Sequence, residues 1–186
     1  MPFAGATLVA AAAAAGSLGL PPTYPTVPMS GIAGPMEMPM IGLGTWQYNS
    51  SVALEAVSTS FAVGYRHVDT ALGYGNQEGV GAALARQNLA RDEYFVTSKI
   101  PGGLNASATT AALEQSLEQL RLDYVDLMLL HWPGSGATSR QEQWLALEAW
   151  AKQGKARAIG ISHYCRHHLD SILSVATLPV ALNQVQ

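Results

Sequence analysis

The residues best suited to chemistry in this sequence are an acid and a phenol five positions apart, Asp69 and Tyr74. They lie in the stretch 64–81, GYRHVDTALGYGNQEGVG, where an alternating strand-like segment runs into a glycine loop around the phenol. Such a pair is typical of one wall of an active site. Two later apolar segments also stop at polar residues, Lys99 and His131.

Together these four side chains indicate acid–base chemistry on a carbonyl group. A free phenol titrates near ~10, and an ammonium group such as that of Lys99 is expected to lower the pKa of Tyr74 by stabilising the phenolate. Asp69 would keep this ammonium charged and oriented, and His131 would orient the carbonyl. Because no activated nucleophile stands out, a bound hydride donor is the expected partner. The polar residues able to hydrogen-bond a flat carboxamide on that donor are Ser162, His163 and Gln184.

A second chemistry uses the histidines instead. His67 and Asp69 would lie on one face of a strand and could bind a divalent metal together with His131 and His163, as in a barrel hydrolase. This alternative leaves Tyr74 without a role and lacks the usual paired-histidine start. It is the less favoured hypothesis, and the preferred reading of the site contains no metal.

Strand-like and helix-like patterns alternate along the chain and would position these residues. The expected strands are 65–70, 94–100, 124–132, 157–163 and 180–186, and the expected helices are 51–64, 77–89, 106–120, 139–154 and 166–175. The expected helix 139–154 would begin with a capping box at Ser139. Repetition of β then α predicts an α/β parallel sheet or barrel with the helices outside. The polar residues then gather at the carboxyl ends of the strands, where such proteins place their chemistry.

Composition excludes several other classes of function. The 186 residues are 48% hydrophobic with a net charge of −3 and no basic cluster, so nucleic-acid binding is not expected. The single cysteine, Cys165, excludes an internal disulfide and is interpreted as a packing residue. Residues 36–41 are expected to form a short strand or hairpin. The glycine loop at 42–47 that follows lacks the third glycine of a dinucleotide-binding fingerprint.

Residues 1–34 differ from the rest of the chain in composition. They contain no Lys or Arg, an alanine run at 10–15 and four prolines after it. We interpret the segment as a flexible low-complexity leader. A cleaved signal is the less favoured alternative because the positively charged start of such peptides is missing, so a cytoplasmic location is expected. The apolar run is too short to span a membrane, and no membrane association is expected.

In combination, the motifs resemble those of the aldo-keto reductase family over residues 36–186. The stretch 64–81 resembles the first signature of that family. The other matching segments are GLGTWQ at 42–47, VTSKI at 96–100, YVDLMLLHWP at 124–133, KARAIGISHY at 155–164 and LNQVQ at 182–186.

This resemblance implies a (β/α)8 TIM-type barrel and the NADPH-dependent reduction of aldehydes and ketones to alcohols, with Tyr74 as the proton donor. The residues it implies as catalytic are Asp69, Tyr74, Lys99 and His131. Those it implies for the cofactor are Gly44, Thr45, Trp46, Asp69, Ser162, His163 and Gln184. Those it implies for the carbonyl substrate are Trp46, Tyr74, His131 and Trp132. His163 departs from the family, which usually has Asn at this position.

The chain reaches only about the fifth strand of such a barrel, which typically takes ~250 residues. We therefore expect residues 35–186 to form a barrel truncated after about five strands, without the later segments that in the family hold the rest of the cofactor. The alternative function is a catalytically impaired fragment or a binding module of the same fold. A complete barrel is expected to be a monomer that binds a small carbonyl compound, whereas an open barrel could self-associate through its edge strand.

Overall fold

The centre of the molecule is a parallel sheet of six strands in the order β3-β4-β5-β6-β7-β8. The computed structural model describes residues 24–185, and residues 1–23 of the expected leader lie outside this range. The strands are β3 (Leu43–Gly44), β4 (His67–Asp69), β5 (Phe95–Ile100), β6 (Val125–Leu130), β7 (Ala156–Ser162) and β8 (Asn183–Gln184). Each strand pairs in parallel with the next one along the chain, as in an incomplete (β/α) barrel. The sequence predicts about five strands, and the additional one is β3, which forms within the expected glycine loop.

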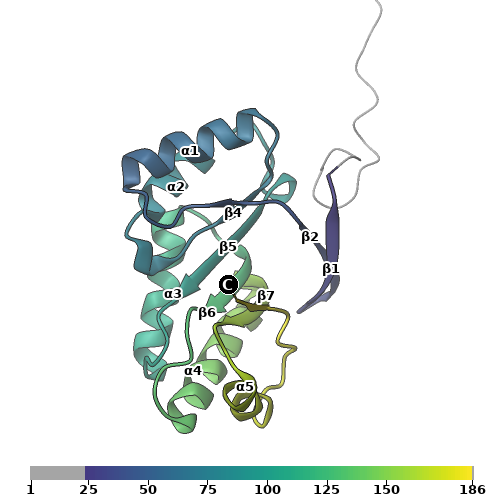
Figure 1. Cartoon of the computed structure of the whole chain (residues 1–186), viewed down its shortest axis with the longest axis vertical. Coiled ribbons are helices and arrows are strands. Elements are labelled where there is room, and N and C mark those ends of the chain that lie inside the picture. The colour runs from purple at the N-terminus through teal and green to yellow at the C-terminus, as the bar shows by residue number, and fades with distance from the viewer. Residues whose placement is uncertain (1–23, 186) are drawn as a thin grey trace, which may run out of the picture.

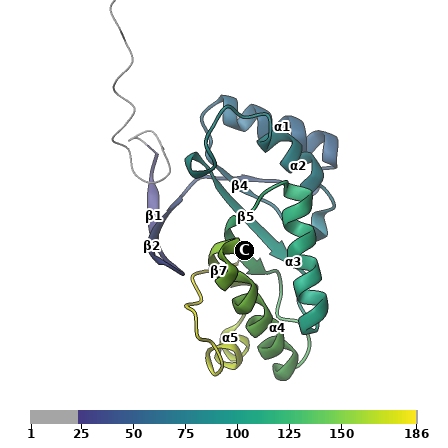
Figure 2. The same ribbon diagram turned by 180° about the vertical axis from the view of Figure 1, so that it is seen from behind.

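Within residues 24–185, five α-helices cover the outer face of the sheet (Figures 1 and 2). They are α1 (Ser50–Ala62), α2 (Gln77–Leu84), α3 (Ala106–Leu120), α4 (Ala137–Trp150) and α5 (Arg166–Leu173). Shorter helical turns are η1 (Leu72–Tyr74), η2 (Arg91–Glu93) and η3 (Ala151–Lys155). In this part of the chain, no helix combines the length and the apolar character that crossing a membrane requires.

Local sequence explains several of the helix ends. Asn49 and Asn105 cap α1 and α3, each accepting a backbone N–H, at 2.9 and 2.8 Å. Gly64 has a φ of 101° just after α1, a conformation that favours glycine, and so breaks the helix as predicted. The predicted capping box at Ser139 is wrong, because α4 begins one turn earlier, after Gly136, whose φ is 81°.

An antiparallel hairpin precedes the sheet. Its strands are β1 (Thr26–Gly31) and β2 (Gly34–Pro39), and it lies apart from the helices, on the other side of the sheet (Figure 1). Met36 packs on the inner face of the sheet, and the Ile32 amide donates to the Arg157 carbonyl at 2.8 Å. The predicted leader, 1–34, therefore extends too far, since residues 26–34 belong to this hairpin.

Side chains of the central strands alternate between two apolar layers. Val96 and Met128 belong to the larger core cluster beneath the helices. Phe95, Leu127 and Ala158 face inward and pack against the hairpin. This alternation is expected for strands covered on both faces. At the carboxyl ends of the strands, the side chains on the inner face of the sheet are polar instead of apolar.

Candidate active site

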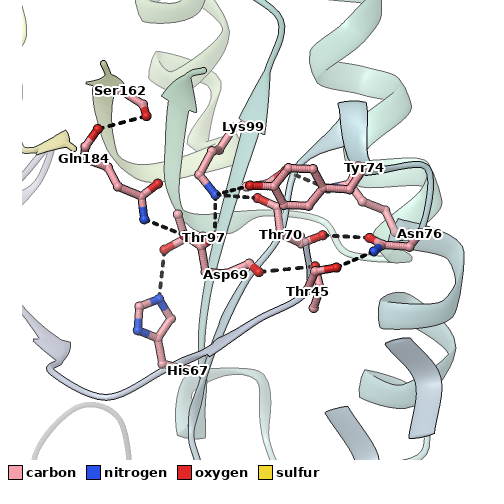
Figure 3. Close-up of polar contacts among 12 residues, drawn as sticks. Thr45, His67, Asp69, Thr70, Tyr74, Asn76, Thr97, Lys99, Ser162 and Gln184 are labelled. Carbon is pink, nitrogen blue, oxygen red and sulfur yellow. Dashed lines mark hydrogen bonds and ion pairs between the residues drawn. The ribbon is translucent and has the colours of Figure 1, made fainter. Parts of the chain in front are cut away.

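Lys99 is the centre of a polar group at the carboxyl ends of the strands (Figure 3). Its ammonium group forms an ion pair with Asp69 Oδ1, donates to the Thr70 carbonyl at 3.0 Å and lies 3.5 Å from the Tyr74 hydroxyl. Lys99 itself is buried, whereas its partners Asp69 and Tyr74 are partly exposed. The structure thus brings together three of the residues that the sequence singles out for chemistry.

Asp69 is held on two sides (Figure 3). While one carboxylate oxygen pairs with Lys99, Oδ2 accepts the side-chain amide of Gln184 at 3.0 Å. The backbone carbonyl of Asp69 accepts both the amide and the hydroxyl of Thr45, at 3.0 and 3.3 Å. Thr45 is fully buried. Asp69 therefore fixes the position of the ammonium group.

Tyr74 stands on the η1 turn, with its hydroxyl directed towards Lys99. Burial, with the Asp69 charge as a second cause, raises the pKa of Tyr74 to about 12. The sequence predicts a lowered pKa for Tyr74, but the pKa is raised instead, because burial, the larger cause, and the Asp69 charge both disfavour the phenolate. Burial also lowers the pKa of Lys99, while Asp69 acts in the opposite direction. The phenol is therefore protonated at neutral pH.

His131 lies just beyond β6, beside the phenol. Its ring centroid is 5.5 Å from that of Tyr74, with the planes at 73°. Burial, followed by the charge of Lys99, lowers the pKa of His131 to about 4, so the imidazole is neutral at neutral pH. Its Nδ1 is buried and has no hydrogen-bond partner among residues 24–185. A neutral imidazole donates from one nitrogen and can hydrogen-bond a carbonyl oxygen.

A cleft of about 330 Å³ opens over these side chains. Its lining residues are Trp46, Gly73, Tyr74, His131, Trp132 and His163. The two tryptophans are 61% and 42% exposed, and the second lies 4.8 Å from the His131 ring. Exposed aromatic walls around a few polar groups are characteristic of small-molecule sites, which usually measure ~300–1,000 Å³.

The loop that carries Trp46 is held in place by Asn76, which lies in the neighbouring loop around Tyr74. From the sequence alone, no role is expected for Asn76. The side-chain amide of Asn76 donates to the carbonyls of Thr45 and Tyr48, at 2.7 and 2.9 Å. Its Oδ1 accepts the Thr70 hydroxyl at 3.3 Å (Figure 3). The sequence shows only an Asn between a glycine loop and a helix, a residue type that often bonds backbone groups, and does not indicate these distant partners.

The loop that carries Trp132 is fixed by close contact with a glycine. A Cβ added at Gly102 would overlap the carbonyl oxygen of Trp132. The loops after β5 and β6 therefore pack backbone to backbone. The sequence shows the glycine but not this contact, because the two loops lie far apart along the chain.

Three of the residues expected to contact a cofactor join β7 to β8. The Ser162 hydroxyl and the His163 amide both donate to the Gln184 carbonyl, each at 2.9 Å. His163 is exposed and adopts a φ of 58°, in the left-handed region where Asn and His are enriched. Gly44, another expected cofactor residue, is exposed at the end of β3.

The alternative metal site does not form. His67 is buried, with Nδ1 3.2 Å from the Pro39 carbonyl and Nε2 3.0 Å from the Thr97 hydroxyl. Both ring nitrogens are therefore occupied, at the opposite end of the inner face from His131. Within residues 24–185, the side chains whose spacing would suit a metal ion are those of Cys165, His167 and His168, which the alternative site does not include. The barrel-hydrolase hypothesis is wrong.

Comparison with known sequences identifies similar proteins in one family. The model of the aldo/keto reductase family matches residues 40–186. A glyoxal reductase of Bacillus subtilis is 44% identical over 153 residues, which cover 81% of this chain and 55% of that protein. A putative methylglyoxal reductase of Salmonella typhi is 36% identical over 149 residues, covering 80% of this chain and 54% of that protein. The chain spans about half the length of these curated relatives.

Solved structures agree with these sequence matches. An aldo/keto reductase from Brucella melitensis has a TM-score of 0.83 and 36% identity, covering 88% of this chain and 63% of that chain. MGS-M4, an aldo-keto reductase from a deep-sea metagenome library, has a TM-score of 0.79 and 39% identity, covering 87% and 58%. The predicted TIM-type architecture is confirmed, with six parallel strands of the barrel rather than about five.

Proposed function

The chain belongs to the aldo/keto reductase family, and from this premise we propose that it reduces a small carbonyl compound with NADPH, using Tyr74 as the proton donor. The observation that carries the proposal is the position of the phenol. Its hydroxyl lies 3.5 Å from the Lys99 ammonium, and its ring meets that of His131 at the wall of the cleft.

The proposed reaction divides between a hydride and a proton. The chemistry that NADPH would supply when bound is a hydride for the carbonyl carbon. As negative charge develops on the carbonyl oxygen, the Tyr74 O–H bond breaks and its proton passes to that oxygen, giving the alcohol. Lys99 stabilises the phenolate that forms, and solvent returns the proton. The high pKa supports this role, because it keeps the donor loaded at neutral pH while the alkoxide is a still stronger base.

His131 would orient the carbonyl before transfer. Its neutral ring can donate one hydrogen bond to the same oxygen that receives the proton, and it contributes no competing positive charge. Two donors at one oxygen hold the carbonyl in a fixed direction and favour the state in which that oxygen is most negative. His131 is therefore the orienting residue in this proposal.

The polar groups near β8 fit a nicotinamide carboxamide, which offers one acceptor and two donor hydrogens. The exposed His163 imidazole can donate, and the Ser162 hydroxyl and the Gln184 side-chain carbonyl can accept. These residues would hold the nicotinamide end of the cofactor. The choice of NADPH over NADH is carried over from the family resemblance.

The substrate class follows from the cleft and from the relatives. We infer a short 2-oxoaldehyde, because two relatives are named glyoxal and methylglyoxal reductases. The cleft of about 330 Å³ between Trp46 and Trp132 is compact enough for such a compound. Its polar lining provides hydrogen-bond donors for a carbonyl oxygen.

The test is NADPH oxidation by the full chain in the presence of methylglyoxal. We expect carbonyl-dependent turnover that Tyr74→Phe lowers by about 10²–10⁴-fold, the usual contribution of a positioned acid. Tyr65→Phe is the matched control, since Tyr65 does not line the cleft. A Tyr74→Phe variant as active as the natural chain would contradict the assignment of the proton donor.

The alternative function, a binding module of the same fold, gives a different result in the same experiment. It predicts a change in NADPH fluorescence on mixing with the chain but no oxidation with any aldehyde. Turnover with methylglyoxal would exclude this alternative. The absence of both binding and turnover would contradict the proposed function and the binding module, and would favour the catalytically impaired fragment.

A further inference from the structure

A second group of reactive side chains lies outside the cleft, at the start of α5. Cys165 is exposed, so its interpretation as a packing residue is wrong. Its Sγ lies 3.0 Å from Nδ1 of His167 and 3.2 Å from Nδ1 of His168. One ligand atom from each of the three residues falls within 4.8 Å of the other two. A thiol and two imidazoles thus converge on one point of the surface.

We propose that Cys165, His167 and His168 form a binding site for a divalent transition metal, of which Zn²⁺ suits them best. Thiolate sulfur and imidazole nitrogen are the ligands that Zn²⁺ prefers in proteins. Three protein ligands leave the fourth tetrahedral position to water.

The spacing of the ligand atoms is close to what this ion requires. Zn–S bonds near ~2.3 Å and Zn–N bonds near ~2.0 Å at a tetrahedral angle place sulfur and nitrogen about 3.6 Å apart. The observed separations of 3.0 and 3.2 Å therefore need to widen by roughly half an ångström. Small rotations of these surface side chains are enough to achieve this.

The backbone on both sides of the cluster is anchored, which presets the ligands. Before it, Tyr164 is buried, and its carbonyl accepts the Asn183 side-chain amide at 2.8 Å. After it, α5 is held by Ile172, which is fully buried in the core. The Cys165 carbonyl accepts the amides of His168 and Leu169, both at 3.1 Å, so the first turn of the helix is closed. A preset site loses less conformational entropy on binding.

The surrounding charges permit a cation at this site. Arg166 and Asp170, on the same helix, pair at 3.8 Å and largely offset each other. Arg140, from α4, donates to the Ser171 hydroxyl at 3.0 Å, so its guanidinium is engaged one turn further along α5. The thiolate formed when Cys165 binds a metal supplies a negative charge that offsets this arginine.

The site is separate from the proposed active site, so the two can be tested independently. None of the three ligand residues lines the cleft. The test uses the reduced full chain without a polyhistidine tag, titrated with Co²⁺ as a coloured substitute for Zn²⁺. We expect one Co²⁺ per chain, a thiolate-to-cobalt charge-transfer band in the near ultraviolet, and displacement of the Co²⁺ by Zn²⁺.

Variants identify the ligands. Cys165→Ser should abolish the charge-transfer band, and His167→Gln and His168→Gln should each weaken Co²⁺ binding by at least about tenfold, a loss seen even for residues that only support metal ligands. The matched control is His163→Gln, an identical change at a nearby exposed histidine, which should bind Co²⁺ like the natural chain. Circular dichroism verifies that each variant is folded, as expected for changes at the surface.

Two results would overturn the proposal. One is the absence of saturable Co²⁺ binding with a thiolate band in the folded natural chain. The other is a His163→Gln variant that loses as much affinity as His167→Gln, which would place the metal towards the cleft rather than at the start of α5.

Discussion

His67 and His131 lie on the inner face of the same sheet, at opposite ends, and their surroundings differ. His67 is buried below the hairpin, and both of its nitrogens have partners, the Pro39 carbonyl at 3.2 Å and the Thr97 hydroxyl at 3.0 Å. His131 borders the cleft, and its Nδ1 has no partner among the described residues. Burial lowers the pKa of both. A lowered pKa therefore does not distinguish the histidine proposed to orient the substrate from the structural one, whereas a ring nitrogen without a hydrogen-bond partner does.

The same contrast applies within a single strand. Thr97 and Lys99 are two residues apart on β5 and point to the same side, because strand side chains alternate. Thr97 closes the layer around His67, whereas Lys99 contacts Asp69 and Tyr74 in the polar layer. Equivalent positions thus stabilise the fold at one end of the strand and form the site at the other.

The largest effect is expected from removal of the ammonium group at the polar end. Lys99→Met should lower kcat/KM by about 10²–10⁴-fold, because the phenolate formed during proton transfer loses its stabilising charge. The variant should also be less stable, since Asp69 is left without its ion-pair partner. Adding Asp69→Asn should restore part of the stability but none of the activity. Thr97→Val is the control at the His67 end of the strand. A large loss of activity in this variant would contradict the division of β5 into a structural end and a site end.

Exchanging the two histidines for leucine separates stability from activity. His67→Leu should cost about 1–3 kcal/mol in urea unfolding, because a buried hydroxyl and a buried carbonyl lose their partner, and should leave kcat/KM nearly unchanged. His131→Leu should instead raise KM and change the free energy of unfolding only slightly. If both variants lost mainly stability, His131 would be a structural residue.

A smaller effect is expected at the contact between the two loops beside the cleft. Gly102→Ala forces a methyl group against the Trp132 carbonyl, so unfolding should become easier by about 1–3 kcal/mol and the substrate should bind more weakly. Gly73→Ala is the stability control, since a Cβ at Gly73 meets no atom within 4 Å. Equal stability changes in the two variants would show that the loops are not packed as described.

The pH dependence of stability gives the smallest of these effects. Both His67 and His131 have pKa values below 6.5 in the folded chain, so the unfolded chain binds protons that the folded chain does not. Stability should therefore fall as pH decreases below about 6.5. Urea unfolding between neutral and mildly acidic pH measures this slope, which His67→Leu and His131→Leu should each reduce. A slope unchanged in both variants would contradict the pKa assignments.

Much of this architecture could be predicted from periodic patterns. Leucines at helical spacing mark α3, and its bounds, 106–120, agree with the prediction. The repetition of strand and helix predicts that Lys99 and His131 lie at strand ends. The two-residue strand β3 gave no such signal, because it exists through pairing of Gly44 with Asp69 and has too few residues for a pattern.

The site was predictable by residue type but not by environment. The sequence places an amine and a carboxylate near the phenol of Tyr74, but it does not show the burial that is the larger cause of the raised pKa. The contacts of Asn76 and Gly102 join loops far apart in the chain, and no local pattern encodes them. Likewise, the exposure of Cys165 depends on how α5 packs, so the sequence alone predicts a packing residue.

The ionisation of Tyr74 tests the central claim most directly, because a proton donor must still hold its proton at neutral pH. The measurement is the ultraviolet absorbance of phenolate against pH, taken as the difference between the natural chain and Tyr74→Phe while circular dichroism shows both to be folded. We predict that the Tyr74 signal stays absent through pH 10 and approaches its midpoint only near a pKa of about 12. A midpoint near neutral pH would contradict the account, since Tyr74 would then no longer hold the proton that it is proposed to donate.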